Sequence, residues 1–255
     1  MNVFITGGTS GIGEALALHY ARISAENKVG ICSHEPVTYA QSLALKNQSN
    51  IYFYTADVTD LQSMQQAVQA FVKIAGTLDL MIANAGISYR KKTYDQPIAE
   101  SLRIIDVNVK GVMNTFEAAI SFMRQQESGH IVAMSSIAAS NGLPTRAAYS
   151  ASKNAVQIWC ESMAIELSRF GVVVSCVKPG FIKSHLTSGN QHAMPFALTI
   201  EETVQNILSG IKKQKFLITF PWPMVWLTNL LSFLPRPLYI LIMKIGAGWL
   251  QDKKE

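Results

Sequence analysis

Short apolar runs of strand length alternate with segments of helix length along almost the whole chain, and this alternation limits the fold more than any other feature. The predicted strands are residues 2–6, 28–32, 51–55, 78–83, 130–135, 172–177 and 216–220. The predicted helices between them are residues 13–23, 62–75, 100–125, 151–170 and 200–210. Such alternation favours a parallel sheet with helices on both faces. The sequence therefore predicts one doubly wound α/β domain of about seven strands over residues 1–220.

The composition suits one soluble core. Of the 255 residues, 49 % are hydrophobic and 15 % are charged, so the chain can build a large core and disorder is excluded. The net charge of +5 permits contact with phosphates or an anionic membrane surface. The basic residues form no long run, and we expect no nucleic-acid partner. No stretch long enough to form a membrane-spanning helix is purely apolar and free of proline.

The cysteines and the amino terminus indicate a reducing compartment. Cys32, Cys160 and Cys176 are odd in number and lack CxxC spacing, so neither a disulfide framework nor a zinc cluster is predicted. They are expected to be reduced thiols in or near the core. His185 and His192 have no carboxylate or cysteine at ligand spacing, so we expect no metal site. With no charged leader before the first strand, the protein is expected in the cytoplasm.

The composition changes at the carboxyl end. Residues 216–235 contain no charged side chain, and four prolines divide the tail into two predicted helices, residues 224–234 and 238–250. Residues 221–255 are therefore an apolar extension and not an independent domain. Three interpretations are open: packing on its own domain or a partner subunit, peripheral membrane contact through residues 221–250, and a lid for a lipid-like substrate. The residues that would assist membrane contact are Trp222, Trp226, Trp249, Lys212, Lys213 and Lys215.

A glycine-rich turn joins the first strand to the first helix. Its sequence is Thr-Gly-Gly-Thr-Ser-Gly-Ile-Gly over residues 6–13. Glycine lets a backbone turn tightly beside a ligand, and a helix amino terminus offers free N–H groups to a pyrophosphate. The alternative is a turn that binds nothing. The candidate dinucleotide-binding residues here are Gly7, Thr9, Ser10, Gly11, Ile12 and Gly13.

The TGxxxGxG spacing resembles that of the short-chain dehydrogenase/reductase family, whose fold is a single Rossmann-type domain. Asn84-Ala85-Gly86 follows the fourth strand as that family's NNAG segment does, and Asp57-Val58 ends the third strand where relatives position the adenine. The resemblance implies cofactor contacts for these five residues. Asn84 has the alternative of ordinary turn chemistry, and Asp57 that of capping a turn.

The end of the second strand bears on which nicotinamide cofactor binds. No carboxylate stands at Ser33 or His34, where an acidic side chain would bond the ribose hydroxyls of NAD and repel a 2′-phosphate. Ser33 can donate to that phosphate, and His34 stands where many NADP-using relatives carry arginine. We expect NADP(H) to be favoured over NAD(H), with His34 as a plain surface residue as the alternative.

Tyr149 and Lys153 are four residues apart and therefore share one helix face. A nearby ammonium lowers the pKa of a phenol, which then exchanges a proton with a carbonyl or alcohol. The alternative is a Tyr and a Lys that straddle core and solvent. The resemblance implies catalytic roles for this pair, for Ser136 on the substrate oxygen, and for Asn108, which matches a helix asparagine that holds a water near the lysine. Ser135 competes with Ser136, and either serine has the alternative of capping its own backbone.

The segment after the sixth strand, Pro-Gly-Phe-Ile-Lys-Ser over residues 179–184, resembles the family segment that closes over the nicotinamide. This resemblance adds Pro179, Gly180, Ile182 and Ser184 to the cofactor-binding candidates. Residues of about 183–200 are expected to form a partly apolar substrate loop that lies over the site.

The residues together predict an NAD(P)(H)-dependent oxidoreductase that transfers a hydride between nicotinamide and a carbonyl or secondary alcohol of apolar character. The alternative is a non-catalytic NADP(H)-binding regulator on the same fold. The predicted helices 100–125 and 151–170 are candidates for the subunit contact of a homodimer or homotetramer.

Overall fold

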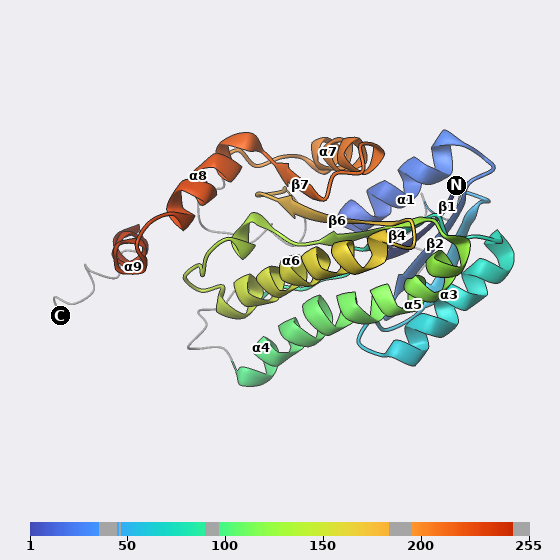
Figure 1. Cartoon of the computed structure of the whole chain (residues 1–255), viewed down its shortest axis with the longest axis horizontal. Coiled ribbons are helices and arrows are strands. Elements are labelled where there is room, and N and C mark those ends of the chain that lie inside the picture. The colour runs from blue at the N-terminus through green and yellow to red at the C-terminus, as the bar shows by residue number, and fades with distance from the viewer. Residues whose placement is uncertain (36–44, 46, 90–96, 184–194, 247–255) are drawn as a thin grey trace.

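Seven parallel strands form one sheet in the order β3-β2-β1-β4-β5-β6-β7 (Figure 1). The computed structural model describes residues 1–35, 45, 47–89, 97–183 and 195–246. The strands are β1 (Asn2–Thr6), β2 (Lys28–Ser33), β3 (Ile51–Thr55), β4 (Leu80–Ala83), β5 (Gly129–Met134), β6 (Val172–Pro179) and β7 (Leu217–Phe220). The predicted fold class is confirmed.

Helices cover both faces of the sheet, so its central strands are apolar on both sides and almost completely buried. Helices α1 (Gly11–Ile23) and α7 (Ile200–Lys212) pack on one face, where Leu16 and Ile207 are fully buried. Helices α3 (Leu61–Ala75), α5 (Gly111–Gln126) and α6 (Ala147–Ser168) pack on the other, where Phe71 and Phe116 are fully buried. The two layers fix the sheet, and the loops at its carboxyl edge carry the candidate site residues.

The strand order reverses between β1 and β4, which lie side by side with Ile5 opposite Ile82. The connections after these two strands run to opposite faces of the sheet. In open parallel sheets this arrangement leaves a crevice at the carboxyl edge, where ligands bind. The glycine turn after β1 and the Asn84 segment after β4 both lie at this crevice.

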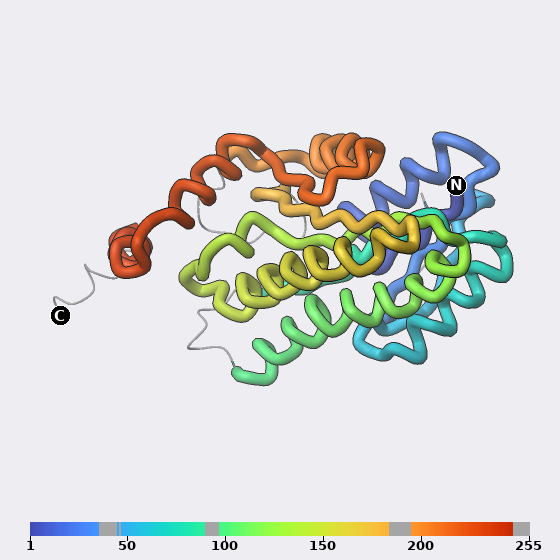
Figure 2. Tube along the Cα trace, in the orientation of Figure 1, coloured from blue at the N-terminus to red at the C-terminus, as the bar shows by residue number. Residues whose placement is uncertain are grey.

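The prediction of a single helix over residues 100–125 is wrong in one respect. The segment consists of α4 (Ile98–Ile105), one π-helical turn (Asp106–Lys110) and α5, which follow one another along one continuous path (Figure 2). Inside the π turn, the Asn108 side chain accepts from Ile87 N at 2.8 Å and donates to Ile87 O at 2.9 Å. The widened turn brings Asn108 into two hydrogen bonds with a neighbouring backbone segment.

Two other predicted boundaries need correction, and the remaining described ends agree within two residues. Helix α6 begins at Ala147 and not at residue 151, directly after Thr145 at φ 63° and the N-cap residue Arg146, so Tyr149 lies in its first turn. The strand predicted from residue 78 begins at Leu80, because Leu78 N donates to the Gln126 side chain instead of joining the sheet ladder.

The apolar extension leaves the domain at the carboxyl edge. It consists of α8 (Trp222–Ser232) and α9 (Arg236–Gly246), which project beyond the layered body in Figure 1. Residues 247–250 of the predicted second helix lie outside the described residues. In the described part of the chain, no helix combines the length and apolar character needed to cross a membrane.

Lys212, Lys213 and Lys215 do not accompany this extension, contrary to expectation. They precede β7, whereas α8 follows it, so a strand of four residues, about 13 Å, separates the lysines from the extension. Cys32, Cys160 and Cys176 are buried free thiols, as predicted.

Candidate active site

The glycine turn folds back on the end of β2 before it enters α1. Gly7 N donates to Cys32 O at 2.9 Å, and Gly7 has a φ of 63°. A Cβ added at Gly13 would lie 2.3 Å from Gly7 O, so only glycine lets the first turn of α1 come this close. The N-cap residue Ser10 makes no side-chain hydrogen bond to the helix. The turn therefore presents the amino end of α1 to the crevice.

Asn84 holds this turn to the end of β4. Its side-chain amide donates to Thr6 O and to Gly7 O, both at 3.0 Å. Thr6 Oγ1 in turn accepts from the backbone N–H groups of Asn84 and Ala85 at 3.0 and 3.1 Å. The Asn84 amide group is thus used as the alternative interpretation held: it stabilises the backbone of the turn through hydrogen bonds. Thr6 is a contributor that the sequence reasoning missed, although it opens the TGxxxGxG pattern.

At the end of β2, the Ser33 hydroxyl donates to the Glu35 carbonyl. The His34 side chain is exposed, and its Nε2 lies 3.5 Å from the Glu35 carboxylate. Neither Ser33 nor His34 is acidic, but Glu35 is the next residue along the chain. The structure therefore places one acidic group beside the position where a 2′-phosphate was expected.

Asp57 and Val58 follow β3 at the same edge. The Asp57 carboxylate accepts from the backbone N and the hydroxyl of Thr59 at 2.8 and 2.9 Å, so it caps a turn as the alternative interpretation held. Val58 is buried, and its backbone oxygen accepts from the Asn114 side chain of α5 at 2.8 Å. Both residues fix the path of the chain along the crevice.

Lys153 and Asn108 meet at Gly86, as the sequence predicts for a joint site. A Cβ added at Gly86 would lie 3.2 Å from Asn108 Oδ1 and 3.4 Å from Lys153 Nζ. Lys153 is buried and donates to Met134 O at 2.7 Å, while burial lowers the pKa of its ammonium to about 8. Asn108 also donates to Ser152 Oγ at 3.1 Å, and that hydroxyl donates to Tyr149 O at 2.7 Å.

Tyr149 lies beside Ser136 and Lys153. Burial raises the pKa of the Tyr149 phenol above its ordinary value, and the hydrogen bond from Ser136 and the charge of Arg146 lower it by less. Lys153 Nζ lies 5.8 Å from the centre of the Tyr149 ring and points to Met134 O. The expectation that the Lys153 ammonium lowers the pKa of this phenol is therefore not met, because burial raises that pKa and the opposing contributions come from Ser136 and Arg146.

The two neighbouring serines have different partners. Ser135 donates to Lys153 O at 2.7 Å and so fastens β5 to α6. Ser136 Oγ accepts from Ala138 N at 3.1 Å, which caps a short 3₁₀ turn (Ile137–Ala139). A hydroxyl that accepts one bond retains its own hydrogen to donate. Ser136 is thus the serine that faces Tyr149, as predicted, and it also caps its own backbone.

Arg146 is a neighbour of the site that the sequence reasoning missed. Its Nη1 donates to Ser88 Oγ at 2.8 Å and to Tyr89 O at 3.0 Å, so it joins the start of α6 to the segment after Gly86. Arg146 and Tyr149 also line one small space of about 10 Å³. Its place three residues before Tyr149, at a helix start, is the signal that could have identified it.

The segment after β6 lies against β7. Pro179 ends β6, and Gly180 N donates to Phe220 O at 2.8 Å. Ile182 forms a parallel bridge with Leu198, so both ends of the predicted substrate loop are paired. Ser184 and residues 185–194 of that loop lie outside the described residues.

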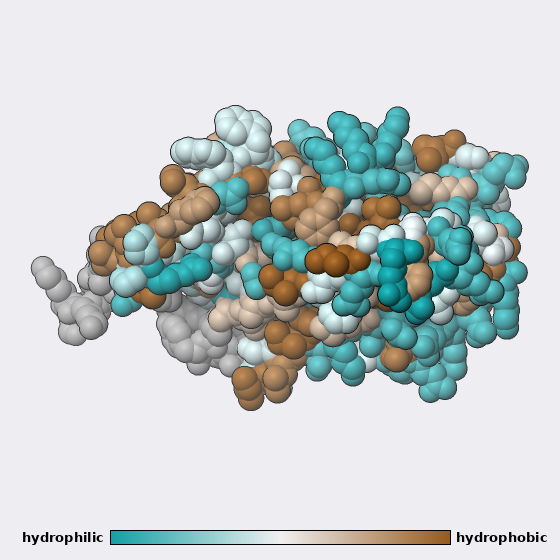
Figure 3. Space-filling model, viewed as in Figure 1, coloured by the Kyte–Doolittle hydropathy of each residue, from teal (hydrophilic) through white to brown (hydrophobic). Residues whose placement is uncertain are grey.

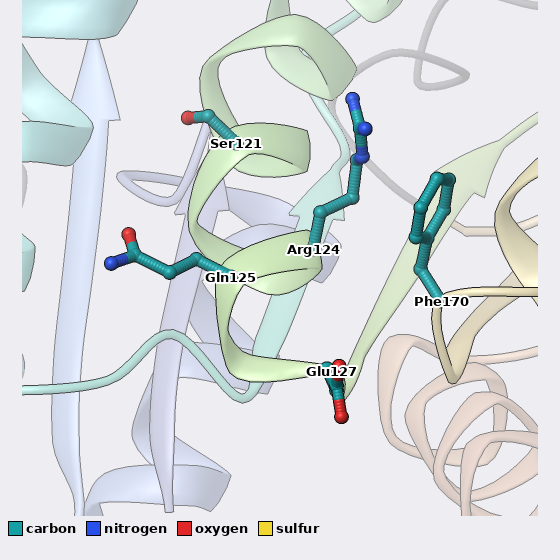
Figure 4. Close-up of a pocket in the computed structure, with 5 residues that line it drawn as sticks. All are labelled: Ser121, Arg124, Gln125, Glu127 and Phe170. Atoms are coloured by element: carbon teal, nitrogen blue, oxygen red, sulfur yellow. The ribbon is translucent and has the colours of Figure 1, made fainter.

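A hollow of about 490 Å³ lies away from these residues. It is lined by Ser121, Arg124, Gln125, Glu127 and Phe170. In Figure 4, Arg124 extends from α5 toward the ring of Phe170, with its guanidinium carbon 4.2 Å from the ring centre. These residues precede β5 and β6 and so lie at the amino edge of the sheet. None of the predicted site residues lines this hollow.

Comparisons with known proteins agree with this geometry. A family model described as short chain dehydrogenase matches residues 1–195. An uncharacterized oxidoreductase of Myxococcus xanthus is 34 % identical over 240 residues, which cover 92 % of this chain and 93 % of that protein. Human epidermal retinol dehydrogenase 2 is 31 % identical over an alignment of 271 residues, which covers 99 % of this chain and 86 % of that protein. The crystal structure of a short-chain type dehydrogenase/reductase from Mycobacterium marinum matches with a TM-score of 0.77 at 25 % identity, covering 86 % and 91 %.

Replacing Gly13 tests the glycine turn. In Gly13→Val the new Cβ would lie 2.3 Å from Gly7 O and 2.5 Å from Asn84 Nδ2, so the turn must open. We expect the Kd for a nicotinamide dinucleotide, measured by fluorescence titration, to rise about tenfold or more, a loss of about 1.4 kcal/mol. Gly142→Ala is the matched control, because its added Cβ meets nothing within 4 Å. Unchanged binding by a folded Gly13→Val variant would show that the turn does not hold the dinucleotide.

Proposed function

This chain belongs to the short-chain dehydrogenase family, and from that premise we propose that it interconverts a carbonyl compound and an alcohol with Tyr149 as the general acid and base. The observation that carries the proposal is the meeting of four side chains beside the glycine turn. Tyr149 adjoins Ser136, and Lys153 adjoins Asn108 at Gly86. A regulator that only binds the dinucleotide needs the turn but not these groups.

The residues at the crevice fit a nicotinamide dinucleotide. The close approach of Gly13 to Gly7 leaves backbone room at the amino end of α1, where a pyrophosphate is stabilised by N–H groups and the helix dipole. When bound, the cofactor supplies or accepts the hydride at its nicotinamide ring. The residues proposed to hold it are Gly7, Thr9, Ser10, Gly11, Ile12, Gly13, Ser33, His34, Asp57, Val58, Asn84, Ala85, Gly86, Tyr149, Lys153, Pro179, Gly180, Ile182 and Ser184.

Tyr149 and Ser136 act on the substrate oxygen. The Tyr149 hydroxyl gives its proton to the carbonyl oxygen in reduction, and the Tyr149 phenolate takes the proton from the alcohol in oxidation. Ser136 accepts from Ala138 N and gives its one hydrogen to Tyr149, and when a substrate binds that hydrogen can turn to the negative charge that develops on the substrate oxygen. Because Ala138 N fixes this hydroxyl, the donor needs little rearrangement when charge develops.

Lys153 and Asn108 support the tyrosine. Lys153 uses one donor on Met134 O, which leaves two for a ribose and for the proton path to Tyr149. With a pKa of about 8, its amine exchanges protons near neutral pH more readily than an exposed lysine. Asn108 reaches the Tyr149 backbone through Ser152, so it orients the first turn of α6 and keeps the proton path in place.

We also propose NADP(H) as the preferred cofactor. Ser33 and His34 carry no negative charge, and the exposed His34 stands at the end of β2, where the 2′-phosphate is proposed to lie. Glu35 opposes this preference, because its carboxylate lies 3.5 Å from His34 Nε2 and would repel the phosphate. We assign the preference to the Ser33 hydroxyl and the His34 imidazole together.

The substrate proposed is apolar and lipid-like. The similarity to a protein named epidermal retinol dehydrogenase 2 supports this class, as does the apolar extension at the carboxyl edge, residues 221–250, for which we propose peripheral membrane contact. The buried free thiols favour a cytoplasmic location. Exposed Ile98, Leu102, Ile158 and Ile165 on α4 and α6 support a homodimer or homotetramer built on these helices.

Removing the phenol hydroxyl tests the proposed chemistry. Tyr149→Phe keeps the ring but loses the proton donor, so kcat for the best carbonyl in a panel of increasing chain length should fall by about 100- to 10,000-fold. The Kd for NADPH should change less than about twofold, because no phosphate contact is lost. Tyr52→Phe, on a strand remote from Ser136, should keep full activity. If Tyr149→Phe retained more than a tenth of wild-type turnover, the acid–base role would be wrong.

The charge of Arg146 determines in which direction the pH dependence of kcat/KM should shift when this residue is replaced. Its positive charge lowers the pKa of Tyr149, so Arg146→Met should raise that pKa. Alcohol oxidation needs the phenolate, and kcat/KM therefore rises with pH through the Tyr149 pKa; in Arg146→Met this rise should move to higher pH. Arg146→Lys keeps the charge and should keep the midpoint, although it loses the fork that reaches Ser88 and Tyr89. A lower rate with an unmoved midpoint in both variants would mean that Arg146 is structural only.

Two substitutions at the end of β2 test the cofactor preference. We expect wild-type protein to bind NADPH more tightly than NADH in fluorescence titrations at one fixed ionic strength. Ser33→Asp should reverse the order, because a carboxylate bonds ribose hydroxyls and repels the 2′-phosphate. Glu35→Gln should strengthen NADPH binding and leave NADH binding unchanged. Tighter wild-type binding of NADH would refute the preference.

A further inference from the structure

For its length, the segment of residues 222–245 exposes far more large apolar side chains than the rest of the described chain. Of the twenty large apolar side chains exposed in the described part of the chain, ten lie in this segment. Trp222 is 79 % and Phe233 is 87 % exposed. Figure 3 shows the resulting brown surface over the projecting end formed by α8 and α9. Apolar patches of this kind on a folded protein mark an interaction surface.

The exposed side chains form two stripes at helical spacing. On α8 and at its end, Trp222, Trp226, Leu230 and Phe233 follow one another at steps of four, four and three residues, whereas Met224 is buried toward the domain. On α9, the exposed residues Leu238, Leu241, Ile242 and Ile245 share one face and Tyr239 is buried. Each helix thus turns its apolar face outward, which is the reverse of an ordinary surface helix. We call these eight residues the apolar face.

The charges around the apolar face select an occupant. Residues 203–251 contain no Asp or Glu, and the only charged residues among the described part of the extension are Arg236 and Lys244. Because these two charges are both positive, two extensions laid face to face would repel one another, whereas a bilayer with anionic headgroups attracts the extension. Tryptophan and phenylalanine beside basic residues are typical of helices that lie in a membrane interface.

Hydrogen bonds tie the extension to the residues that follow Ser136. Asn141 Nδ2 donates to Ser232 Oγ at 2.9 Å, and Arg236 Nη1 donates to Asn141 Oδ1 at 2.8 Å. Tyr239 OH donates to Gly142 O at 2.7 Å. Residues 141 and 142 are five and six positions after Ser136, so the extension is attached at the same carboxyl edge of the sheet as the site.

From this arrangement we propose that the apolar face of α8 and α9 binds an anionic bilayer and thereby opens the active site toward the lipid, from which an apolar carbonyl or alcohol enters. This proposal rests on the proposed function for its substrate class and extends it with the partner surface and the route. Helix α8, with eleven residues or about 16 Å, has the length of a helix that lies along the interface.

Vesicle flotation with the full chain tests the surface without any catalytic readout. We expect co-flotation with vesicles of equal parts phosphatidylglycerol and phosphatidylcholine, and weaker co-flotation with phosphatidylcholine alone or at high salt. The double variant Trp226→Ser with Phe233→Ser should lower the partition coefficient about tenfold or more, because two exposed aromatic side chains lose their insertion. Ile23→Ser with Ile74→Ser, two exposed apolar residues at the ends of α1 and α3, is the matched control and should bind as wild type.

Three results would overturn the surface assignment: no co-flotation of wild type, equal loss in the control variant, or equal binding to both vesicle types. If wild type self-associates and the Trp226/Phe233 variant is a monomer that binds vesicles as well as wild type does, the apolar face would be the contact surface for a second copy of the chain. The route is tested by turnover of one long-chain ketone dissolved in vesicles and one short water-soluble ketone. The variant should lose turnover of the first and keep that of the second. Flotation as expected with no turnover of either ketone by wild type would refute the proposed function and leave the membrane surface standing.

Discussion

The hydrogen bonds from the Asn84 amide to Thr6 O and Gly7 O hold together the two loops on which the site is built. These loops leave β1 and β4 toward opposite faces of the sheet. Without the two hydrogen bonds of Asn84, the crevice at the carboxyl edge would have no fixed width. Gly13 allows the first turn of α1 to approach Gly7 O and the Asn84 amide, since a Cβ there would lie 2.3 and 2.5 Å from them. Two residues after Asn84, the chain reaches Gly86, where Asn108 and Lys153 arrive from the π turn and from α6. One asparagine therefore sets the distance between the turn that fits a pyrophosphate and the groups that fit the reacting oxygen.

Burial of polar side chains at this point is tolerated because each has backbone partners. Lys153 donates to Met134 O, and Asn108 both accepts from and donates to the backbone of Ile87. An unpaired buried amide or ammonium would destabilise the fold, whereas these groups are fixed in one orientation. The same burial opposes ionisation of Tyr149 and of Lys153, so the site favours a neutral phenol until a positive charge nearby compensates. Arg146, at the start of α6, supplies a charge of this sign, but it offsets the burial of Tyr149 only in part.

The sequence alone predicted the strands and a parallel sheet, because apolar runs are local properties of the chain, and the family resemblance implied that Asn108, Ser136, Tyr149 and Lys153 share one site. It did not predict the π turn, since the apolar pattern is helical on both sides and the extra width depends on bonds between Asn108 and Ile87, 21 residues apart. The pKa of Tyr149 was expected to be low, but burial is a tertiary property that no spacing reveals. Lys212, Lys213 and Lys215 were grouped with the tail by sequence proximity, and β7 separates them from it in space. Glu35 was missed because the strand end was examined only as far as His34.

The attachment points of the extension fix where its apolar face lies relative to the candidate site. Asn141 and Gly142 bind α8 and α9 through polar contacts, while Met224 and Tyr239 are the residues that these helices bury. An element with so few buried side chains gains little hydrophobic stabilisation from its own domain, and most of its apolar surface can be removed from water only by an external partner. Because the attachment points follow Ser136 by five and six residues, whatever covers the apolar face is held at a fixed place relative to that serine. A surface that merely anchored the protein could lie anywhere on the domain, whereas this one is connected to the edge of the sheet where Ser136 and Tyr149 meet.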